Sequence, residues 1–459
     1  MSYMKDPGYL QRFAFSNSQL QVMRTFLRYE TALVRDTDPD FGCHASDGCI
    51  GGRTRLGEYV HHQPSDKLDF DGDGYRDIAW WTPPSPNNTS TWEILESTKG
   101  YDPAQKIVVT GFGDLGDIPV PADYNGDGLT DIAVYRPGGD PFSQVDQSYW
   151  YICNNLDCNQ QMAPVPFGLR EDVPLPGLDF DGNPSTGEVA VFRPSEGRWV
   201  WTQVYPNLWA NYTSKYVGAS GSVPLPGLYD LDNATDLVAY LPQYALFEML
   251  LSGDGWTQAA MQQFPNDCVA TDYVGASNSA RAGCVPVRGM IHHIYSYTTP
   301  PPFQLNIFVP RLALSVWDPN AATWITNWNP TAGPSEPTSC VLGTSGETPV
   351  GGLGSPWSNQ WVEGRSRYTT LLGQVWEGGG VFRFRDAPCG NAWNQAAPVV
   401  SPETMVFSVR DMTGDRKPEM WVVDPNTMQA RILRSEDDYT VEASFSPVTV
   451  GMNQWSIIL

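Results

Sequence analysis

The chain has 459 residues, with 51 Asp or Glu against 28 Lys or Arg, so its formal net charge at pH 7 is −23. This excess of negative charge excludes nucleic acid and anionic membrane surfaces as partners, because both require a basic patch. It is compatible with binding cations. Hydrophobic residues make up 41% of the chain, and 43 Gly and 39 Pro punctuate it, which predicts a folded protein of many short strands joined by turns.

Residues 1–66 are predicted to form a separate N-terminal segment. A polar residue at 16–18 can cap a helix whose broad apolar face includes Leu20 and Phe26. No apolar run approaches the roughly 18 residues of a membrane-spanning helix, and the opening MSYMKDPGYL lacks the apolar core of a secretory signal. We therefore expect no membrane insertion.

The strings MSYM and FAFSNSQLQVMRTFL in this segment resemble the Met-turn and following helix of metzincin-type zinc proteases. That resemblance implies a catalytic domain upstream of Met1, covalently continuous with this chain. The family's HExxHxxGxxH motif is absent, and the His pairs at 61–62 and 292–293 lack the i, i+4 spacing of helical zinc ligands. We expect no catalytic residues here and favour a non-enzymatic function.

From residue 67 to 459 one block recurs: a short apolar strand closed by Pro, a turn, and a strand rich in aromatic residues. Clear copies are DIAWWTP, DIAVYRP, EVAVFRP and DLVAYLP, and weaker ones are ALSVWDP, GQVWEGG and EMWVVDP. The period is about 57 residues, which accommodates three or four short strands. Insertions dilute the copies between about 260 and 400. Such segments lie at an exposed face and favour specific binding.

A unit of this size cannot bury both faces of its sheet alone, so neighbouring units must stack. The apolar strands IAVY, VAVF and LVAY suit a position covered on both faces. The sequence therefore predicts an all-β fold: a seven-bladed β-propeller with calcium-binding loops, preceded by the short helical segment.

Acidic ladders precede several of the apolar strands, with oxygen donors at loop positions 1, 3, 5 and 9 and a backbone carbonyl at position 7. Such hard oxygen ligands suit Ca²⁺, which takes six or seven of them, and unpaired carboxylates this close would repel one another. The predicted metal ligands are Asp69, Asp71, Asp73, Tyr75 and Asp77 in the first loop, Asp123, Asn125, Asp127, Leu129 and Asp131 in the second, and Asp411, Thr413, Asp415, Lys417 and Glu419 in the last.

Two further loops depart from this spacing. The third copy has Asp179, Asp181 and Asn183 but needs one extra residue to reach Glu188, and we include its first three donors among the ligands. The fourth copy, with carboxylates at 230, 232 and 236, is two residues short and is not predicted to bind metal. None of the loops is an EF-hand, because a strand follows and position 12 is not Glu.

The loop and the strand after it, as in GFGDLGDIPVPADYNGDGLTDIAVYRP, resemble the FG-GAP or VCBS repeat of integrin-α-like propellers. The resemblance covers roughly residues 67–459. It implies a calcium-stabilised propeller used in extracellular adhesion or in carbohydrate or protein binding.

The eight Cys residues favour an oxidising compartment, since neighbouring pairs occur at Cys43 and Cys49, at Cys153 and Cys158, and at Cys268 and Cys284. Cys340 and Cys389 remain. Zinc binding is disfavoured because the chain contains no CxxC pair.

We expect a secreted binding or adhesion module whose ligand is an extracellular glycan or protein. The alternatives are the C-terminal part of a secreted zinc metalloprotease, a propeller polysaccharide lyase, and a lectin that uses Trp357, Trp361 and Trp393 in the insertions.

Overall fold

The computed structural model of the protein describes the chain from residue 68 onward, with gaps. The described residues are 68–73, 75–138, 146–183, 187–205, 212–230, 232, 234–269, 283–298, 304–327, 338–341 and, beyond these, the strand segments named below. The predicted N-terminal helix therefore lies outside the described residues, as do residues 1–67 altogether. No helix in the described ranges is long and apolar enough to cross a membrane.

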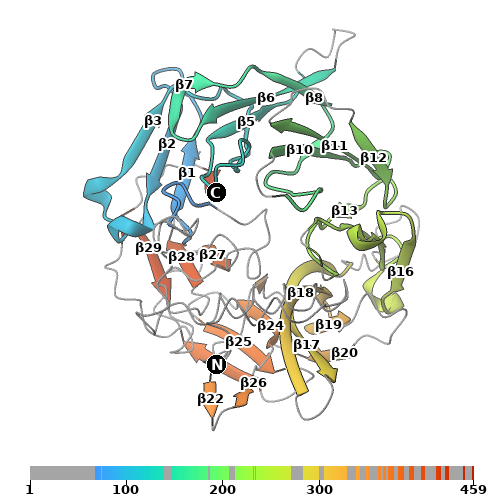
Figure 1. Ribbon diagram of the computed structural model, residues 1–459. Coiled ribbons are helices and arrows are strands. Elements are labelled where there is room, and N and C mark those ends of the chain that lie inside the picture. Colours follow the sequence, from blue (N-terminus) through green and yellow to red (C-terminus); the bar gives the residue numbers. More distant parts are fainter. Residues whose placement is uncertain are drawn as a thin grey trace, which may run out of the picture. The chain divides into compact units, whose positions relative to one another are not determined.

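The described strands form seven sheets of four or five strands and one two-stranded hairpin (Figure 1). The first sheet contains β1 (Ile78–Thr82), β2 (Thr91–Leu95), β3 (Ile107–Thr110) and β31 (Ile457–Ile458). The second contains β4 (Ile118–Pro119), β5 (Ala133–Arg136), β6 (Gln147–Asn154), β7 (Asp157–Gln161) and β8 (Val165–Leu169).

The third and fourth sheets repeat this pattern. The third contains β9 (Val173–Pro174), β10 (Gly187–Arg193), β11 (Arg198–Tyr205) and β12 (Thr213–Tyr216). The fourth contains β13 (Val223–Pro224), β14 (Leu237–Leu241), β15 (Leu246–Leu250) and β16 (Ala259–Gln263). Short 3-10 turns follow some strands: η5 (Ser97–Lys99), η6 (Pro103–Gln105), η7 (Ser252–Asp254) and η8 (Asn266–Cys268).

The last three sheets lie in the C-terminal half of the sequence. The fifth contains β17 (Val285–Thr298), β18 (Gln304–Asp318), β19 (Thr323–Asn327) and β20 (Thr338–Val341). The sixth contains β21 (Thr348–Val350), β24 (Leu371–Trp376), β25 (Val381–Asp386) and β26 (Ala392–Ala396), with the hairpin β22 (Gln360–Val362) and β23 (Arg365–Arg367) inserted. The seventh contains β27 (Met405–Ser408), β28 (Met420–Asp424), β29 (Gln429–Leu433) and β30 (Val448–Thr449).

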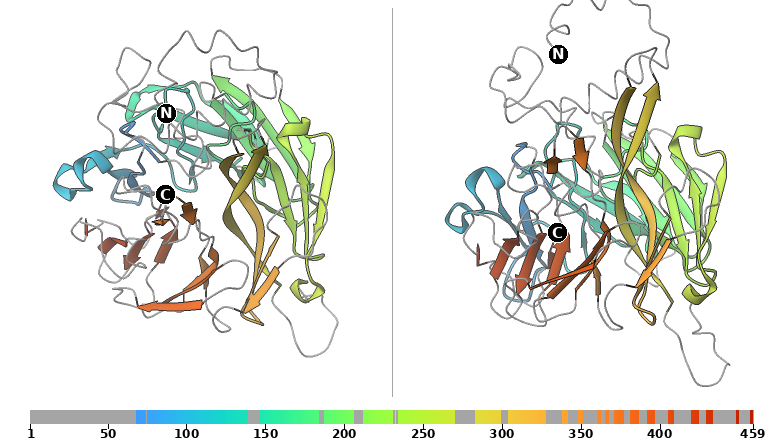
Figure 2. Two further views of the ribbon diagram at one scale, coloured as in Figure 1. Left: turned by 60° about the horizontal axis from the view of Figure 1, so that its bottom comes forward. Right: turned by 90° about the horizontal axis from the view of Figure 1, so that it is seen from below.

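The chain divides into two units, Met1–His62 with His293–Pro310, and Gln63–His292 with Arg311–Leu459. The described part of the first unit consists of residues 293–298 of β17 and 304–310 of β18, two long paired strands that are clear in Figure 2. The second unit carries the repeated sheets. The strand pair predicted for each of the seven sequence copies is present, which confirms the repeat.

Strand β31 comes from the C-terminal end of the chain and pairs with β1 from the first repeat. The register places Ile458 opposite Trp80 and Ile457 opposite Trp81, in antiparallel orientation. The other four-stranded sheets are built from strands of one repeat only. The first repeat contributes three strands, and β31 supplies the fourth.

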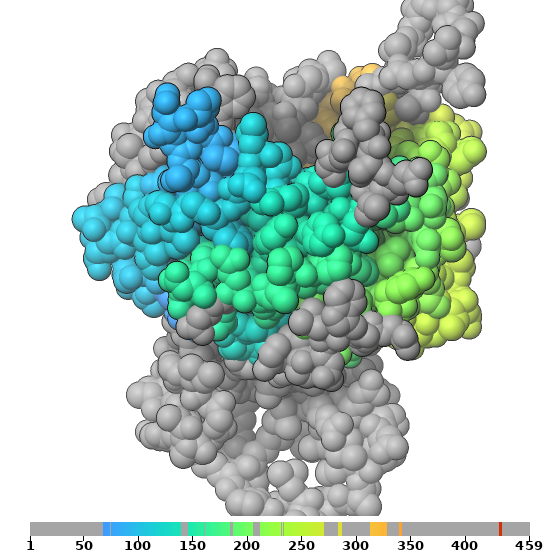
Figure 3. Space-filling model, turned by 90° about the horizontal axis from the view of Figure 1, so that it is seen from above, coloured from blue at the N-terminus to red at the C-terminus, as the bar shows by residue number. Residues whose placement is uncertain are grey.

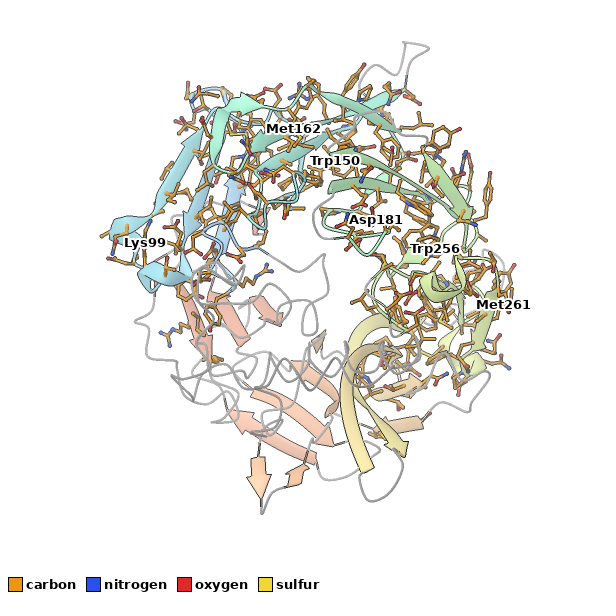
Figure 4. All side chains as sticks on the ribbon, viewed as in Figure 1. Lys99, Trp150, Met162, Asp181, Trp256 and Met261 are labelled. Atoms are coloured by element: carbon orange, nitrogen blue, oxygen red, sulfur yellow. A yellow bond between two sulfur atoms is a disulfide. The ribbon has the colours of Figure 1, made fainter. Side chains whose placement is uncertain are left out.

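The hydrophobic core lies between consecutive sheets. Alternate residues of a strand point to opposite faces, so Val134 in β5 packs with Trp81 and Trp92 of the first sheet, whereas Tyr135 packs with Val191 of the third. Two further buried clusters join the third sheet to the fourth and the fourth to the fifth. Trp150 on β6 is fully buried and forms an edge contact with Tyr135 at 5.2 Å between ring centroids (Figure 4).

Candidate metal centre

The first acidic loop precedes β1 and brings three of its carboxylates together. Oxygen atoms of Asp69, Asp71 and Asp77 all lie within 4.8 Å of one another. Asp69 and Asp77 are buried, and Asp71 is partly buried. The chain reverses at Gly72 with φ of +75°, a conformation that glycine adopts at little cost. Three of the five residues predicted from the spacing therefore converge.

The carboxylate at position 9 holds the loop in place through backbone amides. Asp77 accepts hydrogen bonds from the amide of Phe70 at 2.7 Å and from the amide of Ser97, after β2, at 2.7 Å. The equivalent donors are the amides of Tyr124 (2.9 Å) and Asn155 (2.6 Å) to Asp131, and of Tyr229 (2.6 Å) and Ser252 (2.7 Å) to Asp236. This residue thus fastens each loop to the turn that follows the next strand pair.

Burial raises the pKa of these carboxyl groups. The pKa of Asp77 rises from its ordinary value of 3.8 to about 8, mainly through burial and then through the nearby charge of Asp71. Burial likewise raises the pKa of Asp131 to about 7 and that of Asp179 to about 7. A buried cluster of carboxyl groups that resists ionisation fits a site for a cation, because a bound positive charge would offset both the burial and the repulsion.

The chemistry of the first loop also fits a hard cation. Asp71 accepts from the amide of Asp73 at 3.1 Å and from the hydroxyl of Thr98 at 2.5 Å. A carboxylate has about four acceptor positions, so Asp71 retains capacity for a metal ion. The hydroxyl of Ser97 donates to Asp73 at 2.6 Å. Neither Ser97 nor Thr98 belongs to the ladder, so spacing alone did not identify them.

The second loop repeats backbone contacts of the first but has a different side chain at position 3, Asn125 in place of Asp71. Asp123 accepts from the amides of Gly126 and Gly128, both at 2.7 Å, and Asn125 donates to Asn154 at 2.8 Å. The amide of Leu129 donates to Asp127 at 2.9 Å. Among the described residues, this loop contains no group of three converging carboxylates like that of the first loop.

The third loop does contain such a group, although its spacing is irregular. Oxygen atoms of Asp179, Asp181 and Glu188 lie within 4.8 Å of one another, and Figure 4 labels Asp181. Asn183 donates its backbone amide to Asp181 at 2.8 Å. Glu188 was not among the predicted ligands, but the extra residue in this loop brings it to the place of the ninth position.

In the fourth loop, a serine hydroxyl lies among the carboxylates. The hydroxyl oxygen of Ser252 lies 2.6 Å from a carboxylate oxygen of Asp232 and 3.0 Å from one of Asp236, so it can donate to either. The amide of Gly253 donates to Asp230 at 3.0 Å. The loop is therefore cross-linked by protein donors. The predicted ligands of the last loop, from Asp411 to Glu419, lie outside the described residues, as does Trp357, while Trp361 lies in β22 and Trp393 in β26.

Consecutive loops contact one another through the residue before the last carboxylate. Thr130 of the second loop accepts from the amide of Asp69 at 2.8 Å and donates its own amide to the Asp69 carbonyl at 2.8 Å. Thr235 makes the same pair of contacts with Asp179 at 3.1 and 2.6 Å. Gly187 of the third loop instead lies against the backbone of Tyr124. The acidic loops therefore also join neighbouring sheets.

Two of the predicted disulfides are confirmed, Cys153–Cys158 and Cys268–Cys284. Cys340 is also disulfide-bonded, and Cys43 and Cys49 lie outside the described residues.

Solved structures with a similar course of the chain have low sequence identity to it. Apo AztD from Citrobacter koseri is 11% identical with a TM-score of 0.36, covering 83% of this chain and 97% of that chain. The dihydro-heme d1 dehydrogenase NirN in complex with DHE is 12% identical with a TM-score of 0.38, covering 93% and 90%. Likenesses this weak carry no inference about function. No curated protein matches the sequence significantly. Residues 69–134, which span the first two acidic loops and the first half of β5, match the family model of the FG-GAP-like repeat.

Proposed function

We propose that this protein is a calcium-stabilised, seven-bladed β-propeller that acts as an extracellular binding or adhesion module for a glycan or protein. The observation that carries the calcium part is the convergence of Asp69, Asp71 and Asp77 within 4.8 Å. The pKa of Asp77, raised to about 8, supports the site because a bound cation would stabilise the ionised form of this buried carboxyl group. The third loop, with Asp179, Asp181 and Glu188, is a second candidate site.

The blade arrangement is supported by the sheet order. Consecutive sheets share their buried clusters, as stacked blades would. Strand β31 pairs with β1, which would close a circular array without leaving β1 as an open edge. Calcium in loops that join neighbouring sheets would then fasten the blades and leave outer surfaces for a ligand. The disulfides support an oxidising, extracellular setting.

The test combines metal content with thermal melting. We expect tightly bound Ca²⁺ by mass spectrometry and a melting temperature that falls when EGTA removes the metal, since an ion bound only by the folded state stabilises it. Asp71→Ala, which removes the side-chain oxygen atoms, should reduce both the calcium content and the EGTA-sensitive part of the melting temperature.

The control is Asp102→Asn, because Asp102 is a partly exposed acid outside the acidic loops that caps η6, and Asn caps equally well. Absence of bound calcium together with identical melting in EGTA would contradict the calcium part of the proposal.

A further inference from the structure

A cavity of about 580 Å³ opens on the second sheet, away from the acidic loops. The residues that line it include Asp114, Arg136, Gln147, Tyr149, Tyr151 and Arg170. They come from the segment before β4, from the end of β5, from β6, and from the residue after β8. Figure 3 shows the face on which the described residues between 100 and 170 are exposed, coloured blue to green.

Two tyrosines of β6 supply an aromatic surface in this cavity. Tyr149 and Tyr151 are two residues apart on one strand and so share a face. Their ring centroids lie 6.5 Å apart, and Tyr149 is 36% exposed. The guanidinium of Arg136 lies 4.5 Å from the centroid of Tyr151. One ring is therefore held by Arg136, and the ring of Tyr149 is accessible.

Arg136 is itself fixed, which makes the cavity wall rigid. Its Nε and Nη2 donate to the two oxygens of buried Asp117, both at 2.8 Å, and Nη2 lies 2.6 Å from Asp114. Bidentate pairs of this kind hold both partners in one geometry. A preorganised wall of this kind lowers the entropy cost of binding a ligand.

The tyrosine pair belongs to this sheet alone among the first four. The strand register places Thr91 and Glu93, Arg198 and Val200, or Leu246 and Glu248 at the equivalent positions of the first, third and fourth sheets. Aromatic residues that recur in every repeat serve the common core, as Trp92, Trp150 and Trp199 do. Tyr151 also packs against the core between the first and second sheets, whereas Tyr149 is 36% exposed inside the cavity, has no aromatic counterpart in the other three of these sheets, and does not serve that core.

The polar groups of the cavity suit an uncharged ligand with many hydroxyl groups. Two Asp and two Arg side chains balance in charge. Arg170 has no side-chain bond to any described residue, and Gln147 uses its amide nitrogen for the carbonyls of Ser148 and Gly168, at 3.0 and 2.9 Å, so its carbonyl oxygen can accept from a ligand. An accessible aromatic ring flanked by planar donors and acceptors matches the apolar face and the hydroxyl edge of a sugar ring.

We propose that this cavity binds carbohydrate and holds a neutral pyranose unit against Tyr149. The proposal rests on the proposed function as a binding module and names the ligand class and the site. The formal net charge of the whole chain, −23 at pH 7, favours neutral over polyanionic sugars because it repels the latter.

The experiment measures binding of the whole chain, with calcium present, to an immobilised panel of neutral and acidic oligosaccharides, followed by calorimetric titration of the neutral tetrasaccharide that binds best. Tyr149→Ala should weaken binding by about tenfold or more, because it removes the stacking surface. Tyr149→Phe should retain the affinity within about threefold, since the ring remains.

The matched control is Tyr216→Ala. Tyr216 is 62% exposed and also has an arginine over its ring, Arg198 at 5.7 Å, but it lies outside the cavity on β12. Binding by this control should equal that of the parent protein, and unchanged melting temperatures would show that each variant is folded.

Three results would overturn the proposal. The first is that no neutral glycan binds, and the second is that Tyr149→Ala leaves binding unchanged. The third is that only acidic glycans bind and that Arg170→Gln abolishes this binding. The failure of the proposed calcium role is separable, because it would appear as EGTA-insensitive melting whether or not the cavity binds sugar. Calcium-dependent stability without any glycan binding would contradict this inference and still support the proposed calcium role.

Discussion

At the scale of single residues, a buried ion pair recurs in two of the sheets and is replaced in a third. Asp172 is fully buried in its side chain and binds Arg193 through two contacts, at 2.8 and 3.0 Å, as Asp117 binds Arg136. In the fourth sheet the corresponding residues are Ser222 and Leu241. The Ser222 hydroxyl still accepts a hydrogen bond from the backbone amide of Ala219 at 2.7 Å, as the Asp172 carboxylate does from the amide of Leu169 at 2.8 Å. The turn before the short strand therefore needs a side-chain acceptor, but it does not need the ion pair with arginine.

Arg193→Leu should reduce the free energy of unfolding by about 3–5 kcal/mol, because it leaves the Asp172 carboxylate buried without its partner. The double variant Asp172→Ser with Arg193→Leu, which copies the fourth sheet, should recover most of that loss. Urea unfolding of the parent protein, both single variants and the double variant measures the coupling. A double variant as unstable as Arg193→Leu alone would contradict this account.

The carboxyl group of Asp236 predicts a pH dependence. Burial first, and then the charge of Asp230, raises its pKa from the ordinary 3.8 to about 7. The folded protein therefore holds this proton more tightly than the unfolded chain does. Its contribution to stability is fully present below about pH 4 and is lost as the pH rises through 7.

The measurement compares the parent protein with Asp236→Asn in EGTA from pH 4.5 to 8, so that bound metal plays no part. The variant should lose about 1–3 kcal/mol at the acidic end, because an amide nitrogen cannot accept the backbone hydrogen bonds that the carboxyl group receives. Its stability should depend less on pH than that of the parent, so the two curves should approach each other as the pH rises. Parallel curves would refute the assignment of this titration to Asp236.

At the scale of elements, the sequence predicted the strands whose apolar residues form the core. It did not predict the short strands that exist only through backbone hydrogen bonds to a neighbouring strand. Apolar runs such as 131–136 and 188–193 indicate strands that are buried on both faces, because each face of such a strand packs against a neighbouring sheet. The two-residue strands β4, β9 and β13 carry Val-Pro or Ile-Pro and have no such pattern. They exist because they pair with β5, β10 and β14. A pairing between distant segments leaves no local periodicity.

The acidic loops divide in the same way. Regular spacing identified the first loop correctly as a cluster, since Asp69, Asp71 and Asp77 do converge. The same spacing in the second loop gives no such cluster, and the irregular third loop does so through Glu188. The second loop differs at position 3, where Asn125 replaces Asp71 and donates its side-chain amide to Asp131 and Asn154 instead of supplying a carboxylate. The turns after the next strand hold the carboxylate at position 9 in the same way in both loops. The loop residues therefore decide which carboxylates converge, and the packed sheets hold the loops in place.

Gly187 tests how closely neighbouring elements approach. A Cβ at this position would lie 1.8 Å from the Tyr124 carbonyl oxygen, which belongs to the backbone of the preceding loop. Gly187→Ala should therefore force the second and third sheets apart and cost about 1–3 kcal/mol or more. Gly221→Ala is the control, because it meets no atom within 4 Å and carries only the strain of its φ of +82°. Chemical unfolding should place the first variant clearly below the second, and equal stabilities would show that the loops separate easily.

At the scale of the whole molecule, the first sheet depends on both ends of the described chain. Strand β1 carries Trp80 and Trp81, both 1% exposed, and the edge that is not paired with β2 pairs with Ile457 and Ile458. Bringing these segments together closes a loop of several hundred residues. Loop-closure entropy grows only slowly with length, so a short strand can offset it when it also satisfies an open edge.

A chain that ends at Ser456 should therefore lose the fourth strand of its first sheet and melt at a lower temperature, whereas one that ends at Ile458 should melt like the parent. Because unpaired backbone groups of β1 would become exposed, the shorter protein should also self-associate, which light scattering detects. Hydrogen exchange locates the effect: amides of β1 should lose protection in the shorter chain, and those of β14, three sheets further along the sequence, should not. Uniform loss of protection would mean that the sheets unfold as one cooperative unit, and unchanged protection of β1 would mean that β31 contributes nothing to the stability of the first sheet.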